Sequence, residues 1–201
     1  MSWDAMGVAV REAGRGVRRP EELAQRWQKR RDRADEAPPW ELFPVLLGIA
    51  VAGTAVYGMV MHMHRGVEGM AFGAATFPAA AGLAWGLAFP ALYIIHTALG
   101  SRLDLSSTAL AALLTVSFGA AAMLASVPIS WFFALALPYT AVRWAVHLVI
   151  FAGVSVCMAD VFLRVLKAME PTRVPAYGIF WLILLTCLGT QLFWLFGLFD
   201  F

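Results

Sequence analysis

The residues that could hold a metal ion gather in one short run, Met59-Val60-Met61-His62-Met63-His64. Thioether and imidazole groups are ligands that suit copper. The run occurs once, at the end of an apolar segment, and adjacent residues of a helix point in different directions. Methionines that fill gaps between helices and histidines that reach the membrane interface explain the same residues. We therefore expect no cofactor, and His62 and His64 are only the alternative metal ligands.

Other ionisable side chains lie inside apolar segments, where such groups are candidates for an ion or proton path. Arg143 and His147 are four residues apart, as are Asp160 and Arg164, so each pair shares a helix face. Both pairs lie toward the ends of their segment, where side chains reach lipid headgroups, and Asp160 can pair with Arg164. His96 and His147 fall about 20 Å apart in depth, which excludes a shared haem. No hydrolase triad order, phosphate loop or HExxH helix is present, so we predict no enzymatic activity.

The charge distribution divides the chain into two parts. The 201 residues are 61% hydrophobic, and the mean hydropathy is +0.72. Nine of the fifteen Lys and Arg residues and seven of the thirteen acids lie before residue 40. We therefore predict a charged cytosolic helical arm with its linker over residues 1–39, and a five-span transmembrane bundle over residues 40–201.

The arm is predicted to form two helices. Apolar residues recur at three- and four-residue intervals from Trp3 to Val17, with charged residues on the other face, as in an amphipathic helix. A second helix is expected from Pro20 to about Ala34. We expect the arm to contact membrane lipids or another protein subunit, and not nucleic acid, because acids are interleaved with the bases. The residues expected to make these contacts are Trp3, Arg26, Trp27, Lys29, Arg30, Arg31 and Arg33.

Five apolar segments are long enough to cross a bilayer, so the expected fold is an all-α polytopic membrane bundle. The predicted spans are residues 42–63, 72–100, 105–126, 141–166 and 174–199, with Asp104 as a helix-capping candidate for the third. Pro90 is expected to kink the second span. Pro128 is expected to break the chain after the third span, leaving residues 131–137 as an interfacial or re-entrant piece.

Polar side chains and cysteines within the spans carry further expectations. Tyr93 and Gln191 are predicted to face the bundle, with Gln191 hydrogen-bonded across a helix interface, because an unpaired amide in hydrocarbon costs several kcal/mol. Cys157 and Cys187 fall in different spans, about 12 Å apart in depth. That separation exceeds the reach of a disulfide, so we expect two free buried thiols.

The orientation follows from the positions of Lys and Arg. If the N-terminus is inside, thirteen of these residues lie on the inner side and two, Arg65 and Arg143, on the outer side. Positive residues concentrate on the cytoplasmic side of membrane proteins. We therefore predict a protein of the bacterial inner membrane, with its N-terminus in the cytoplasm and its C-terminus outside.

Five short motifs carry a family resemblance: Tyr57-Gly58-Met59, Phe89-Pro90-Ala91-Leu92-Tyr93, Gly100-Ser101-Arg102-Leu103, Pro128-Ile129 and Gly189-Thr190-Gln191-Leu192-Phe193-Trp194. From about residue 40 onward the chain resembles bacterial five-span membrane proteins that are distantly similar to the Yip family. Similarity to the Yip family implies trafficking or membrane-organising partners in eukaryotes and no agreed activity in bacteria. The resemblance supports an interaction protein more than an enzyme.

Two functions fit these expectations. The first is a non-enzymatic integral membrane subunit that anchors or assembles a complex, with residues 1–36 as the cytosolic contact. The alternative is a transporter or permease subunit, or an ion pathway, with a cavity at helices broken near Pro90 and Pro128. Transport sites gather polar groups on discontinuous helices near the membrane midplane. This chain has hydroxyl groups and Gln191 in its spans but no midplane charge, which favours the subunit.

Overall fold

The computed structural model describes residues 3–32, 40–136, 139–171 and 176–198. The helices in these ranges are α1 (Trp3–Arg18), α2 (Pro20–Asp32), α3 (Leu42–Met61), α4 (Gly66–Ala98), α5 (Leu105–Ala136), α6 (Thr140–Met169) and α7 (Ala176–Leu195). A single 3₁₀ turn, η1 (Met63–Arg65), joins α3 to α4, and the described residues contain no strand. The five helices α3 to α7 are long and apolar enough to cross a membrane. The predicted all-α membrane bundle is confirmed.

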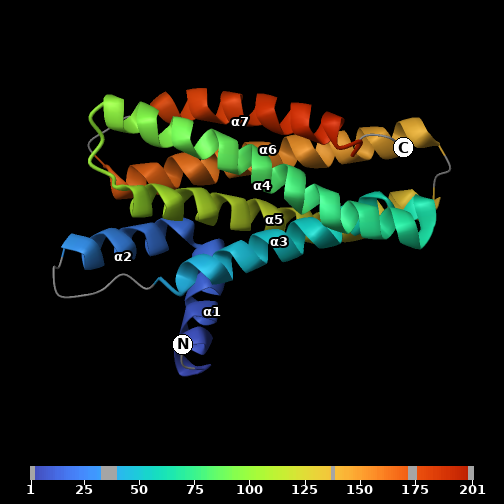
Figure 1. Cartoon of the computed structure of the whole chain (residues 1–201). Helices are drawn as coiled ribbons and strands as arrows, with labels where there is room; N and C mark the ends of the chain where they lie inside the picture. Colours follow the sequence, from blue (N-terminus) through green and yellow to red (C-terminus); the bar gives the residue numbers. More distant parts are fainter. Residues whose placement is uncertain (1–2, 33–39, 137–138, 172–175, 199–201) are drawn as a thin grey trace.

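The helices are arranged around α5, which carries the longest series of buried residues. α5 packs against α3 on one side and α6 on the other, while α4 packs against α3 and α7. Figure 1 shows α2 running along the bundle beside α5, and α1 projecting across the bundle axis. We call the end of the bundle that holds α2, the loop 99–104 and the C-terminus of α6 the arm end, and the opposite end the far end.

Pro90 and Pro128, which were expected to kink or break the chain, lie inside continuous helices. α4 runs through Pro78 and Pro90, and α5 runs through Pro128 to Ala136. The prediction of a break after the third span was therefore wrong, and residues 131–136 are the end of α5. A proline removes one backbone hydrogen bond, and the packing of neighbouring helices supports the rest of a long apolar helix. The second span also begins earlier than expected, at Gly66.

Tryptophan and phenylalanine rings join the helices near the arm end. The Trp181 side chain of α7 is fully buried and donates a hydrogen bond from Nε1 to the Ala88 carbonyl of α4 at 2.7 Å. Its ring lies 5.0 Å from Trp85 and 4.8 Å from Phe162, measured between centroids. A buried indole N–H needs such an acceptor in an apolar environment, so this bond fixes α7 on α4.

A second aromatic cluster joins the helices nearer the far end. Phe77 of α4 lies 5.7 Å from Tyr57 of α3 and 4.9 Å from Phe193 of α7, centroid to centroid. Phe151 of α6 lies 6.1 Å from Phe193. Four membrane-spanning helices therefore meet at one depth, and this depth is a reference level for other residues.

Two glycines let α3 and α4 cross with their backbones in contact. A methyl group at Gly58 would overlap the carbonyl oxygen of Gly73, and a methyl group at Gly73 would overlap that of Gly58. Small residues allow this close approach between helices in membranes. Gly48, on the same helix as Gly58, faces open space.

Gly58→Ala is expected to destabilise the bundle, because the added methyl group forces the two backbones apart. Overpacking of this kind costs about 1–3 kcal/mol. Thermal unfolding of the purified chain in detergent measures the effect as a lower midpoint. Gly48→Ala is the matched control, and its midpoint should stay the same or rise, because alanine favours helix over glycine. Equal midpoints for the two variants would show that the crossing has room for a side chain.

Candidate functional site at the junction of arm and bundle

The second arm helix is folded onto the bundle and is not free in solution. Leu23, Ala24 and Trp27 are buried in one apolar cluster with residues of α5, α6 and α7, and Trp27 is only 3% exposed. α2 contacts both α5 and α6. Burial of a tryptophan in a core contributes several kcal/mol, since truncation of such residues costs about 3–5 kcal/mol. The arm and the bundle are therefore joined by a core that both parts share.

Asp104, which precedes α5, is the polar centre of this junction. Its carboxylate accepts hydrogen bonds from the Ser107 backbone N–H at 2.9 Å and the Ser106 hydroxyl at 2.6 Å, as an N-terminal cap does. The Arg31 guanidinium of α2 pairs with the same carboxylate at 2.5 Å. Arg31 and the Trp27 indole also donate to the Ser107 hydroxyl oxygen, at 3.1 and 3.2 Å. One carboxylate thus caps α5 and holds the end of α2.

The charge of Asp104 is stabilised by these contacts. Burial raises the pKa of the carboxyl, but the hydrogen bonds from Ser106 and Ser107 and the positive charge of Arg31 outweigh burial and lower it below its ordinary value. Asp104 is therefore ionised in the folded protein at neutral pH.

Glu170, the residue that follows α6, holds the loop between α4 and α5 in the same way. Its carboxylate accepts hydrogen bonds from the Ser101 hydroxyl at 2.7 Å and the Arg102 backbone N–H at 2.8 Å. Arg164 of α6 pairs with Asp160 at 2.9 Å, which confirms the predicted pair, and with Glu21 of α2 at 3.3 Å. Carboxylates and arginines therefore connect α2, α5 and α6 at the arm end.

The arm residues predicted to bind lipid or a partner have separate roles. Trp27 is buried within the chain, so its predicted outward contact was wrong, and Arg31 is held by Asp104. Trp27 and Leu23 lie on the face of α2 that the bundle covers, whereas Arg31, one turn later, is still exposed. Arg30 pairs with Glu12 of α1 at 3.7 Å.

Of the other predicted arm residues, two are exposed to the outside of the bundle and two lie outside the described residues. Arg26 pairs with Glu22 at 3.7 Å and is exposed, and Lys29 is exposed. Arg33 and the Trp3 side chain lie outside the described residues. The outward surface of α2 therefore presents Gln25, Arg26 and Lys29, none of which is aromatic.

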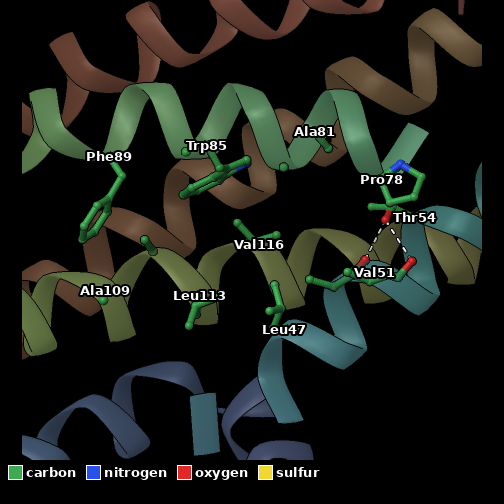
Figure 2. Close-up of a pocket in the computed structure, with 14 residues that line it drawn as sticks. Leu47, Val51, Thr54, Pro78, Ala81, Trp85, Phe89, Ala109, Leu113 and Val116 are labelled. Atoms are coloured by element: carbon green, nitrogen blue, oxygen red, sulfur yellow. Dashed lines mark hydrogen bonds between the residues drawn. The ribbon is translucent and has the colours of Figure 1, made fainter. Parts of the chain in front are cut away.

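An apolar groove lies between α3, α4 and α5 (Figure 2). Its volume is about 300 Å³. Trp85 and Phe89 reach from α4 toward α5, and Leu47 and Val51 line the side formed by α3. The Thr54 hydroxyl at its edge donates to the carbonyls of Ala50 and Val51, at 2.7 and 3.1 Å. The groove therefore offers hydrocarbon contacts and no group for acid–base or ligand chemistry.

Three of the four histidines, His62, His96 and His147, are buried, whereas His64 is half-buried in the turn η1. His147 is 4% exposed and its Nδ1 lies 2.8 Å from the Tyr57 hydroxyl, so the expectation that it reaches headgroups was wrong. His62 is fully buried, with Nδ1 3.2 Å from the Gly58 carbonyl. His96 lies 3.2 Å from the Thr108 hydroxyl. Helix packing explains these positions, because tyrosine, threonine and carbonyl groups supply polar neighbours within the protein.

For the metal alternative at His62 and His64, the structure tests only His, Cys, Asp and Glu as further ligands. Within the ranges that the structure describes, no group of three His, Cys, Asp or Glu residues is arranged to hold a metal ion. The two cysteines, Cys157 and Cys187, are free thiols, but both are exposed on the bundle surface, so the prediction of buried thiols was wrong.

The two polar residues predicted to pack inside the bundle differ. Tyr93 is half-buried, with its ring 5.4 Å from His96, which agrees with a packed position. Gln191 is exposed on α7, so its predicted place inside the bundle was wrong. α7 turns Trp181 and Leu188 toward its neighbours, and this leaves Gln191 on another side of the helix.

Comparisons with protein-family models, with curated proteins and with solved structures gave no match. The similarity to the Yip family therefore stays a prediction from the motifs quoted above.

The contact between Arg31 and Asp104 predicts a pH-dependent junction. Because the folded pKa of Asp104 is lowered, its contribution to stability is fully present above the unfolded pKa and is lost as pH falls through the folded pKa. Acid should therefore loosen α2, which hydrogen exchange of the α2 amides measures as lost protection. Asp104→Asn should show reduced protection at neutral pH and a smaller further loss in acid. The same acid response in both proteins would assign it to other carboxylates.

Proposed function

We propose that this chain is a non-enzymatic integral membrane subunit that anchors or assembles a membrane protein complex, with the outward faces of α1 and α2 as its contact surface. The observation that carries the proposal is the docking of α2 on the bundle through Trp27 and Asp104. This docking holds α1 in a fixed direction across the bundle axis (Figure 1). A contact surface that is ordered before binding loses less conformational entropy when a partner arrives.

The outward surface of the arm suits an acidic partner. Between α1 and α2 lies a polar hollow of about 410 Å³. Arg19 and Arg26 there pair with Glu22, whereas Arg15 and Arg18 have no carboxylate partner among the described residues. Arginines bind carboxylates and phosphates through two parallel N–H groups. An acidic segment of another membrane subunit, or anionic headgroups beside it, complements this surface.

The alternative, a transporter or permease subunit or an ion pathway, depended on helices broken near Pro90 and Pro128. Both helices are continuous, and the space between α3, α4 and α5 is lined by apolar side chains. Polar groups on discontinuous helices are the usual basis of a transport site. These observations favour the subunit.

We propose the bacterial inner membrane as the location, with the arm end in the cytoplasm. Arg31, Arg102 and Arg164 all contact the junction at the arm end, beside the cationic surface of α1. Positive residues are concentrated on the cytoplasmic side of membrane proteins. The far end then faces outward.

Cysteine labelling tests this orientation. In a variant in which Cys157 and Cys187 are replaced by serine, we expect Val67→Cys, which is 82% exposed at its native position, to react with an impermeant maleimide added outside cells. Gln25→Cys, on the exposed face of α2, should react only after the membrane is opened. The reverse pattern would place the arm outside.

Neutralising the outward arginines of α1 should remove partner binding without unfolding the chain. The variant replaces Arg11, Arg15 and Arg18 by glutamine, since all three are exposed. Chains that co-purify with the native protein in mild detergent should fall at least about tenfold, as expected when several charge-assisted contacts are lost. The thermal midpoint should not change.

The matched control replaces Arg102 and Lys167, which are exposed at the same end of the bundle but outside the arm, by glutamine. Its co-purifying chains should match those of the native protein. Deleting residues 1–36 does not test the contact surface alone, because the deletion also removes Leu23 and Trp27 from the apolar core. An unchanged set of co-purifying chains in the arm variant would refute the contact surface.

A further inference from the structure

One side of α7 is turned away from the rest of the bundle. α7 packs mainly on α4, with few contacts to α6. The opposite side presents residues spaced three or four apart, which fall on one face of a helix. These exposed residues are Phe180, Ile183, Cys187, Gln191 and Trp194. We call them the outer face of α7.

Gln191 lies deep on this face and not at the membrane edge. Two residues further along α7, Phe193 meets Phe77 and Phe151 in the aromatic cluster. Each of these two partners lies eleven residues from the far-end terminus of its own helix, Gly66 or Thr140, which is about 16 Å. α6 is about 45 Å long, so it exceeds a hydrocarbon core of about 30 Å by roughly 15 Å. If this excess is divided equally between the two ends of α6, the level of Phe193 lies within the hydrocarbon. Gln191, two residues away on α7, then lies within it as well.

The neighbouring hydroxyl groups on α7 are satisfied, whereas the Gln191 amide is not. Thr186 donates to the Leu182 carbonyl at 2.8 Å, and Thr190 donates to the Thr186 carbonyl at 2.9 Å. Among the described residues, the side-chain hydrogen bonds on α7 are those of Trp181, Thr186 and Thr190, and none involves the Gln191 side chain. An amide without partners in hydrocarbon costs several kcal/mol. The amide is therefore available to a partner outside this chain.

We propose that two copies of this chain pair through the outer face of α7, with the Gln191 amides hydrogen-bonded to each other. A primary amide both donates and accepts hydrogen bonds, so the Gln191 amide of a second copy supplies the missing hydrogen-bond partner. Two copies inserted with the same orientation are related by a two-fold axis along the membrane normal, which brings equal residues together at one depth.

The shape of the outer face fits such a pair. Cys187 and the adjoining exposed residue Thr190 are small, which lets two helices approach closely, and Ile183 and Trp194 flank them as large apolar side chains. Ile183 is 59% exposed and Trp194 75% exposed in the single chain. Figure 1 shows α7 on the side of the bundle opposite α1 and α2. This pairing is therefore independent of the arm contact, and both surfaces can be occupied at once.

Disulfide trapping tests the pairing, because Cys187 lies at the centre of the outer face. The full chain carrying Cys157→Ser is oxidised with copper phenanthroline in its native membrane. We expect a disulfide-linked dimer. The matched control retains Cys157, which is exposed on α6, and carries Cys187→Ser. It should give no dimer. Equal trapping by the two cysteines, or none by Cys187, would overturn the proposal.

The role of the amide is tested by Gln191→Leu in the Cys157→Ser background. We expect dimerisation in lipid vesicles, measured by energy transfer between labelled copies, to weaken about 3- to 20-fold, the range for interhelical hydrogen bonds in membranes. Gln191→Asn keeps the amide and should retain pairing. Gln191→Leu with unchanged dimerisation would overturn the proposal. The chain with Arg11, Arg15 and Arg18 replaced by glutamine should still be trapped, which separates this test from that of the arm.

Discussion

The structure depends on one constraint: a polar group carried into hydrocarbon needs a partner within the protein. For several buried groups, the bundle meets this need with contacts between helices. The Ser117 hydroxyl of α5 donates to the Leu46 carbonyl of α3 at 2.8 Å, and the Trp181 indole of α7 donates to α4. The Tyr57 hydroxyl of α3 meets His147 of α6. Each contact satisfies a buried group and also sets the position of one helix on another. The same few side chains therefore provide hydrogen-bond partners and fix the arrangement of the helices.

At the arm end, near the membrane–water interface, polar groups are also paired within the protein. Two carboxylates, Asp104 and Glu170, each accept a backbone N–H and side-chain donors from another element. Asp104 stays ionised, and Ser107, which donates its backbone N–H to this carboxylate, also accepts the Trp27 indole N–H at the edge of the apolar cluster. The arm is therefore part of the folded unit, and its outward direction is fixed by the bundle.

Much of the fold could be predicted because long apolar segments and charged ends are local properties of the sequence. The cap at Asp104 and the Asp160–Arg164 pair were predicted for the same reason. The docking of Trp27 could not be predicted, since an apolar helix face fits a membrane surface and a protein core equally well. The predicted break at Pro128 was wrong because a helix that contains proline is supported by the packing of neighbouring helices, which the sequence does not show. Gln191 was misplaced because α7 is apolar on all sides, so no periodicity tells which side faces the bundle.

The unequal lengths of the helices have a consequence for the surrounding lipid. α3 and α7 have 20 residues each, whereas α4, α5 and α6 have 30 to 33. α5 stays apolar to its end, where Phe132 and Leu135 are more than half exposed. A bilayer of uniform thickness cannot match both sets, so lipid beside α7 is compressed relative to lipid beside α5, or the bundle tilts. The difference in helix length is therefore a source of hydrophobic mismatch within one bundle.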